Sequence, residues 1–368
     1  MMRILVIMLR VKYIPGIYMS CNSLSTRRIW ICVVEIKDAK IMSDTSTLPN
    51  PSRLKFFPVT FFAIVMGFSG LTLAWHKGAH VLGIHFPIGH VLAGATFAVF
   101  LTILAIYTVK FAKYPKAVIG ELNHPVTMAF FPAISISMLL LSICMLDLHE
   151  PLALGLWALG AALHLVLTLH VVRSWINHDH FDVGHLNPAW FIPAVGNVVV
   201  PITGMHFGYV EISWFYFAIG MSFWIVLLTI VFNRMLFHEP MPVMLLPTMF
   251  ILIAPPAVGF ISYLKLNGGH IDTFAHVLYY LALFLTLLLM VEIPRFIRLP
   301  FFLSWWAYSF PMTAITVATF VMSAKTGQTF LFVLALALLA AVSGLILLLL
   351  FKTLQAIAQK TICVERKH

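Results

Sequence analysis

Apolar segments of nearly equal length dominate this chain from residue 53 onward. Ten stretches, separated by short polar loops, cover most of the sequence, and each has the length of about 20 residues that a helix needs to cross a bilayer. They begin near Phe56, Ile88, His124, Pro151, Pro188, Glu211, Val243, Ile271, Phe301 and Gln328. The pattern predicts an all-α polytopic membrane protein, with ten transmembrane helices in one domain at residues 53–355.

Prolines occur in the interior of alternate apolar stretches only. The first, third, fifth, seventh and ninth stretches hold, in turn, Pro58, Pro132, Pro193 with Pro201, Pro255 with Pro256, and Pro311. A proline within a helix removes a backbone donor and frees a carbonyl, which hydrocarbon tolerates only where the break faces protein or water. We therefore expect five proline-kinked inner helices that line a central pore, shielded from lipid by the five even-numbered helices.

The spacing of these prolines suggests an internal repeat. Pro132, Pro193, Pro255 and Pro311 follow one another at intervals of 61, 62 and 56 residues, close to the length of a helical hairpin with its loops. Five hairpins, each a broken helix followed by an intact one, are the simplest interpretation. The alternative is that prolines are simply common in membrane helices.

Composition and charge support a membrane protein and predict its orientation. The chain is 61% hydrophobic and 10% charged, with a mean hydropathy of +0.98, far outside the range of soluble globular proteins. With a cytoplasmic N-terminus, the inside segments after residue 42 carry thirteen Lys and Arg, whereas the outside loops carry only Lys77, Lys265 and Lys325. The positive-inside rule then predicts an integral protein of the cell (inner) membrane with both termini cytoplasmic.

The same charges favour anions over cations. Counting acids as well, the cytoplasmic segments have a balance of +6 and the outside loops a balance of −1. A positive vestibule raises the local concentration of anions, although the positive-inside rule alone would place much of this charge on that side.

The odd-numbered stretches contain small or hydroxyl residues in place of charges. No Asp, Glu, Lys or Arg lies in the middle of any of them, which weakens the case for an ion-coupled relay or an enzyme. We therefore predict no catalytic residues and no cofactor. The candidate pore-lining residues are Gly67, Gly70, Ser135, Gly196, Gly204, Gly259 and Thr313.

Histidines and cysteines do not form a convincing metal motif. His76 and His80 are four residues apart, and His178, His180 and His185 cluster before the fifth stretch, but neither group contains a cysteine. Loop histidines at a membrane surface explain both groups, so we predict no metal site. His164, within the fourth stretch, is expected to be a packed or hydrogen-bonded histidine.

The two ends of the chain differ from the membrane domain. Residues 1–41 hold a short apolar core broken by Arg10, Lys12 and Pro15, and a polar stretch follows Met42. We interpret residues 1–52 as an N-terminal cytoplasmic segment, in which residues 1–41 are a mis-assigned extension ahead of a start at Met42. Residues 356–368 are expected to form a short basic cytoplasmic tail.

Several motifs resemble one family of membrane proteins. SWWAYSFPMTAITVAT (residues 304–319), LNPAWFIPAVGN (186–197), IAPPAVG (253–259) and FFPVTFFAIVMGFSGLTLAW (56–75) are similar to the ninth, fifth, seventh and first helices of the slow anion channels of plant guard cells and their bacterial relatives, the tellurite-resistance and dicarboxylate transporters. The resemblance implies a homotrimer with one pore in each protomer. It also implies that Phe310 matches the aromatic residue that occludes the family's pore.

These observations lead to one principal hypothesis and two alternatives. The first is an anion channel that conducts small inorganic or organic anions through a pore gated by Phe310, in contact with membrane lipid and with no nucleic-acid partner. The second is a proton-linked secondary carrier for C4-dicarboxylates, sulfite or tellurite. The third is a membrane-embedded enzyme, for which the sequence offers no polar constellation. Phosphorylation control is not expected, because the chain has no long cytoplasmic tails.

Overall fold

The computed structural model describes residues 17–23, 30–36, 52–177 and 181–364. The chain divides into two compact units, Met1–Ser52 and Arg53–His368. In the first unit, β1 (Ile17–Ser23) and β2 (Trp30–Ile36) form an antiparallel hairpin in which Ile17 lies opposite Ile36. Most of the extension predicted at residues 1–41 lies outside the described residues, and its mis-assignment stays a prediction.

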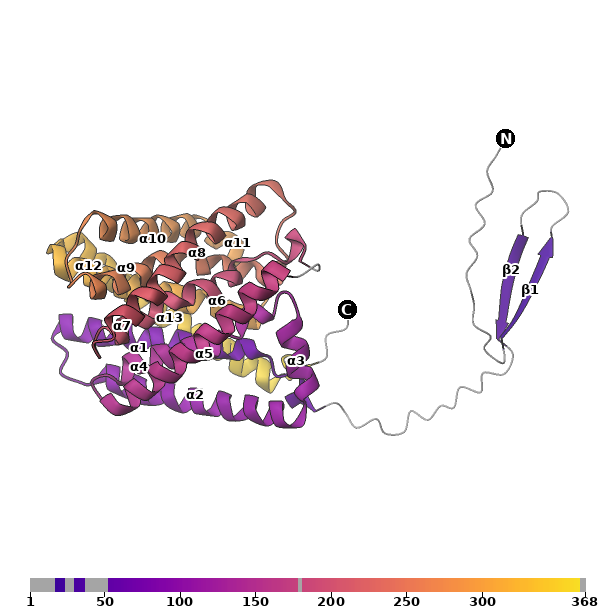
Figure 1. The fold of residues 1–368 in the computed structure, drawn as a ribbon, viewed down its shortest axis with the longest axis horizontal. Helices are drawn as coiled ribbons and strands as arrows, with labels where there is room; N and C mark the ends of the chain where they lie inside the picture. The colour runs from indigo at the N-terminus through magenta and orange to yellow at the C-terminus, as the bar shows by residue number, and fades with distance from the viewer. Residues whose placement is uncertain (1–16, 24–29, 37–51, 178–180, 365–368) are drawn as a thin grey trace. The chain divides into compact units, whose positions relative to one another are not determined.

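The second unit is a bundle of helices (Figure 1). Its α-helices are α1 (Phe62–Leu82), α2 (Ile88–Lys113), α3 (Pro115–Asn123), α4 (Ala133–Met145), α5 (Glu150–Asn177), α6 (Phe191–Val195), α7 (Val200–Gly204), α8 (Val210–Phe237), α9 (Ala254–Leu266), α10 (Thr273–Val291), α11 (Ile293–Ile297), α12 (Ser309–Thr326) and α13 (Thr329–Ala358). Its 3₁₀ helices are η1 (Arg53–Phe56), η2 (Val59–Phe61), η3 (Met128–Phe130), η4 (Val183–His185), η5 (Pro188–Trp190), η6 (Gly196–Val199), η7 (Val243–Ile253) and η8 (Leu303–Tyr308). The all-α expectation is confirmed for this unit.

Nine helical segments of the described chain are long and apolar enough to cross a membrane. The fifth predicted helix differs, because residues Pro188–Gly204 are shorter and divide into α6, η6 and α7 with a preceding turn, η5. Pro193 and Pro201 cannot donate to a helical ladder, and η6 interrupts the α-helix between them. The count of ten crossings and the division into five hairpins stay predictions.

Burial separates these helices into two layers. In the apolar 18-residue stretch of each of the four long segments that contain α1, α4, α9 and α12, 67% to 78% of the residues are buried, against 28% to 39% in the corresponding stretches of α2, α5, α8, α10 and α13. The proline-containing segments therefore form the inner layer. They also close a ring, because α1 packs on α4, α4 on α7, α7 on α9, α9 on α12, and α12 on α1.

Each inner segment begins as a 3₁₀ helix and continues as an α-helix near its proline. Pro132 directly precedes α4, Pro201 and Pro255 occupy the first turns of α7 and α9, and Pro311 is the third residue of α12. The first turn of an α-helix has no intrahelical partner for its N–H groups, so a proline fits there without breaking a hydrogen bond. The prolines therefore lie at or near junctions between 3₁₀ and α-helix, and the predicted kinking of the inner helices stays a prediction.

Pro58 lies before its inner helix and not within it. It has extended backbone angles (φ −84°, ψ 153°) and precedes η2, so it stands ahead of the first inner helix. Pro193 lies at the third residue of α6, in the most broken inner segment.

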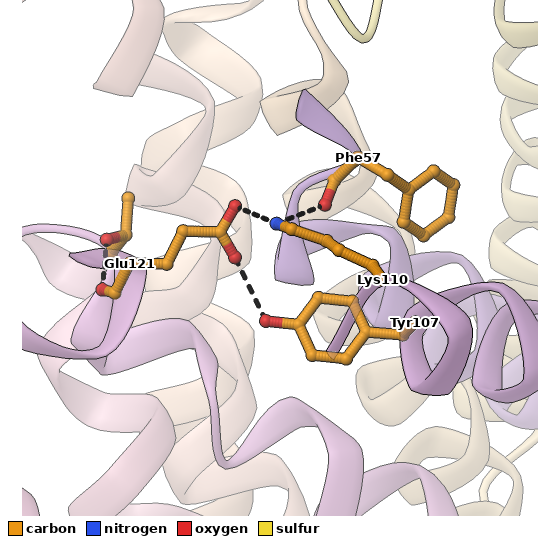
Figure 2. A network of polar contacts seen from close by, with 5 residues as sticks. Phe57, Tyr107, Lys110 and Glu121 are labelled. Carbon is orange, nitrogen blue, oxygen red and sulfur yellow. Dashed lines mark hydrogen bonds and ion pairs between the residues drawn. The ribbon is translucent and has the colours of Figure 1, made fainter. Parts of the chain in front are cut away.

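A buried ion pair fixes the entry to the first inner helix (Figure 2). Lys110 of α2 is fully buried, and its ammonium group contacts Glu121 Oε1 of α3 at 2.6 Å and donates to the Phe57 carbonyl at 2.8 Å. Tyr107 donates to the other Glu121 oxygen at 2.9 Å. A buried ammonium group is tolerated only when it is paired and hydrogen-bonded. This network connects α2 and α3 to Phe57, the residue before Pro58.

Candidate pore

The ring of inner segments encloses two cavities, one at each end. The first, which we call the apolar cavity, has a volume of about 70 Å³ and lies toward the ends where the inner segments begin. All five inner segments contribute to its wall, for example through Ala63, Phe130, Val195, Ala254 and Ala307. No charged side chain of a described residue lines it.

The second cavity, which we call the basic cavity, has a volume of about 600 Å³ and lies toward the C-terminal ends of the inner segments. Leu73, Leu140, Ile202, Ile261 and Thr313 supply one wall residue from each inner segment. Its ionisable lining residues in the described chain are His76, Lys77, His90, Cys144, Asp147, His206, Lys265 and Lys325. The two cavities thus differ sharply in polarity.

Phe310 lies between the two cavities. Among the described residues, only Phe310 and Val258 line both the apolar and the basic cavity. Phe310 occupies the first turn of α12, where the Thr313 hydroxyl donates to its carbonyl oxygen at 2.8 Å and Pro311 fixes the next φ angle. The ring is therefore carried on a stretch of backbone with few conformations available to it.

The predicted pore-lining residues fall into two groups. Gly196 lines the apolar cavity, as do Pro255 and Pro311, and Gly70 and Thr313 line the basic cavity. The other four candidates line neither cavity in the described chain; they are Gly67, Ser135, Gly204 and Gly259.

Glycines outside the cavity walls allow helices to approach closely. A Cβ atom on Gly67 would collide with the Ser309 side chain of α12, and one on Gly204 would collide with Ser213 of α8. At Gly259 a Cβ would lie 3.2 Å from the sulfur of Met221. These three glycines face neighbouring helices, and the residue type alone could not distinguish such a position from a pore wall.

Polar side chains complete the hydrogen bonding at the break in the fifth segment. Asn197 donates to the carbonyls of Ala194 at 2.7 Å and Pro193 at 3.3 Å, and the Thr168 hydroxyl of α5 also donates to Pro193 at 2.7 Å. These side-chain donors hydrogen-bond to carbonyl groups at the break, where a proline lacks the N–H of a regular helix. Thr168 was not among the residues predicted from the sequence; an asparagine between two prolines of one apolar stretch is the signal that could have pointed to such a site.

His164 is a buried histidine next to the same break, as expected. Its Nδ1 lies 2.9 Å from the Ser135 hydroxyl, which also donates to the Pro132 carbonyl at 2.8 Å. Its Nε2 has no hydrogen-bond partner in the described chain and lies 2.8 Å from the position that a Cβ of Gly196 would occupy. Only glycine fits at residue 196 without displacing the imidazole ring.

The charges on the cavity walls do not follow the balance of loop charges, which favoured the opposite end of the bundle. Lys77, Lys265 and Lys325 all line the basic cavity, whereas none of the more numerous bases predicted at the opposite end lines the apolar cavity. Two acids that do not line the basic cavity have other partners: Glu150 Oε1 lies 3.1 Å from His206 Nε2, and Asp272 caps α10 by accepting from the Ala275 N–H. The Tyr263 hydroxyl donates to Asp272 at 2.5 Å and lowers the pKa of that carboxyl group.

Metal ligands are scattered in the part of the chain that the structure describes. No group of three or more His, Cys, Asp or Glu side chains there could hold a metal ion. His76 pairs with Asp147 at 3.4 Å, while His178 and His180 of the second histidine cluster lie outside the described residues.

Comparisons with known proteins identify the family of this fold. Residues 56–354 match the profile of the SLAC1 family, described as voltage-dependent anion channels. Among curated proteins, an uncharacterized transporter of Methanocaldococcus jannaschii is 28% identical over 73% of this chain and 85% of its own length. The tellurite resistance protein TehA homolog of Haemophilus influenzae is 26% identical over 75% of this chain and 83% of its own length.

The plant relatives are longer proteins. The S-type anion channel SLAH3 of Arabidopsis thaliana is 32% identical over 74% of this chain, but the match spans only 44% of SLAH3. Because the family profile covers most of the residues that form the inner ring and both cavities, this chain is a membrane protein of the SLAC1 family of anion channels and transporters, which are not enzymes.

Proposed function

We propose that this chain is an anion channel in which the Phe310 ring closes the pathway between the apolar and basic cavities. The observation that carries the proposal is the position of Phe310 on the wall of both cavities. A phenyl ring across a narrow apolar passage excludes water and imposes a dewetting barrier on an ion. The absence of charged lining in the described part of the apolar cavity supports such a barrier.

The proposal also covers the orientation of the protein in the membrane and its assembly into a homotrimer. With both termini cytoplasmic, as the positive-inside rule predicts, the apolar cavity faces the cytoplasm and the basic cavity faces outward across the cell (inner) membrane. Residues 53–355 would form the channel domain, although α13 continues to Ala358. The exposed apolar side chains of the outer helices, such as Leu347 and Phe351, suit contact with lipid or with neighbouring protomers of the proposed homotrimer.

The proposed gate is tested by current measurements on Phe310→Ala. Purified wild type and variant are compared in planar bilayers under a chloride gradient. Lowering the barrier by about 3 kcal/mol raises the current on the order of 100-fold, with a reversal potential that follows the anion gradient. Phe130→Ala is the matched control, because Phe130 lines the apolar cavity only, and it should leave the current near that of wild type.

A carrier is the second candidate, favoured by the size of the basic cavity. At about 600 Å³ this cavity is larger than a halide ion needs, so it has room for a C4-dicarboxylate, sulfite or tellurite. If wild type and Phe310→Ala are both silent in bilayers, while liposomes accumulate a labelled dicarboxylate or sulfite under a proton gradient, the carrier is the correct function and Phe310 is not a gate.

A further inference from the structure

We propose that Lys77, Lys265 and Lys325 form an anion-capture site in the basic cavity, which concentrates small anions at that mouth and favours divalent over monovalent ones. The inference rests on the proposed function, in that captured anions then enter the pathway past Phe310. It concerns a different group of residues, however, and it is tested without measuring transport.

The three lysines come from three different inner helices. Lys77 lies on α1, Lys265 on α9 and Lys325 on α12, and all three line one cavity. They are the three bases that the predicted topology assigns to the outside loops. Folding therefore gathers into one space the charges that are scattered along the chain.

None of the three lysines forms an ion pair within the described part of the protein. No carboxylate oxygen of a described residue lies within 4.0 Å of any of the three ammonium nitrogens. Lys110 provides the contrast, because its buried ammonium group contacts Glu121 at 2.6 Å. Lys110 stabilises the contact between α2 and α3 and is paired with a carboxylate. The three cavity lysines have no such partner, so each can bind a mobile anion.

The remaining ionisable groups of the cavity leave its charge positive. Asp147 is the only carboxylate among the described lining residues, and it pairs with His76 at 3.4 Å. The ring of His90 lies 6.0 Å from that of His76, and His206 contacts the Glu150 carboxylate. With all three histidines neutral, three ammonium groups face one carboxylate, so the cavity is positive without any histidine protonation.

Helix ends account for part of this arrangement but not for all of it. Lys265 and Lys325 lie in the last turns of α9 and α12, where a cation interacts favourably with the helix dipole. Lys77 does not lie in the last turn of α1, which ends at Leu82. The dipole therefore does not explain why all three side chains line the same cavity.

The potential determines which ligands this site takes. A cleft lined by charge of one sign raises the local concentration of counter-ions by a factor on the order of 10 to 1,000. The electrostatic energy scales with the charge of the ligand, so sulfate is concentrated more strongly than chloride. The volume of about 600 Å³ accommodates such an oxyanion with part of its hydration shell.

A thiol reporter in the cavity measures this potential directly. Val321→Cys, on the wall of the basic cavity, is introduced after the four native cysteines are replaced by alanine. Its reaction rates with the anionic sulfonatoethyl and the cationic trimethylammonioethyl methanethiosulfonates are compared with those of a free thiol in solution. We expect the ratio of anionic to cationic rates to exceed that of the free thiol on the order of 10-fold.

Substitutions then assign the potential to the lysines. Replacing Lys77, Lys265 and Lys325 together by Gln should return the ratio to nearly that of the free thiol, and each single replacement should lower it partly. Lys113→Gln is the matched control, because Lys113 lies in the last turn of α2 and lines neither cavity, so it should leave the ratio unchanged. If the triple variant fails to fold, the single variants and 1 M salt, at which the screening length is about 3 Å, give the same test.

Competition tests the preference for divalent anions. At equal ionic strength, sulfate should slow the anionic reagent more than chloride does. The proposal is overturned if the ratio equals that of the free thiol, if the lysine replacements leave it unchanged, or if chloride competes as well as sulfate. If the protein shows the expected ratio but passes no current, the capture site is supported and the channel is refuted. If it passes current but does not show the ratio, the channel is supported and the capture site is refuted.

Discussion

At the scale of the residue, the surroundings of a side chain decide its role more than its type does. Gly67 and Gly70 are three positions apart on α1, and both pack closely against α12. Gly70 also lines the basic cavity, whereas Gly67 lines neither cavity. Asn197 and Thr168 act as backbone partners where a helix is broken. Such residues contribute to stability and need not touch a transported ion.

Asn197→Ala is expected to destabilise the protein. The variant removes the side-chain donor 2.7 Å from the Ala194 carbonyl and one of two side-chain donors to the Pro193 carbonyl. A buried polar group without a partner costs about 1–3 kcal/mol, so the melting temperature in detergent should fall. Asn177→Ala is the control, because the Asn177 amide, which donates to Arg173 at 3.0 Å, is exposed. Equal melting temperatures for the two variants would contradict this role for Asn197.

At the scale of the element, close packing of α1 on α12 holds the helix that carries Phe310. Gly67 and Gly70 allow this approach, since a Cβ on either residue would collide with Ser309 or Thr313. The inner segments also share one design, a 3₁₀ start that becomes an α-helix near a proline. The position of the Phe310 ring therefore depends on two helices that contact each other through glycine.

Gly67→Val is expected to separate these two helices. Overpacking of a tight contact costs about 1–3 kcal/mol, and the shift of α12 should change the Phe310-dependent current even though Gly67 lines neither cavity. Gly94→Val on α2 is the matched control, because a Cβ there meets no atom within 4 Å. Thermal stability and bilayer current are measured for both variants, and a Gly67→Val protein that behaves like Gly94→Val would exclude a tight contact.

At the scale of the whole molecule, the fold encloses an apolar cavity at one end of the inner ring and a basic cavity at the other. The orientation of the protein in the membrane decides which solution the proposed capture site meets. Helix α13 offers a direct test, since exposed glutamines flank it: Gln328 before its first residue and Gln359 after its last.

Labelling of intact cells should report the orientation. In a cysteine-free background, a membrane-impermeant maleimide should modify Gln328→Cys, on the predicted outer side, but should not modify Gln359→Cys until the cells are opened. The two variants are controls for each other, because they replace the same residue type at opposite ends of one helix. Labelling of Gln359→Cys alone in intact cells would mean that the protein is inverted and that the basic cavity faces the cytoplasm.

The hydrophobic pattern and the alternating prolines were sufficient to predict the helices and to separate the inner segments from the outer ones. Both are local signals, because the length of an apolar run and the lack of a proline N–H act within one segment. The fine form of the fifth segment was not predictable, since a chain with Pro193 and Pro201 can kink or divide into shorter helices. Its observed form depends on donors such as Thr168 on another helix.

The sequence by itself determined the class of the protein, the position of its membrane segments and, through the motif around Phe310, the family that the comparisons identify. Only the tertiary structure decided which residues face a cavity. Loop charges gave a balance of −1 at the end where Lys77, Lys265 and Lys325 lie, yet the cavity there is basic. The physical reason is that an ion responds to the charges that line its path, and the direction of a side chain is set by helix packing between segments distant in the chain.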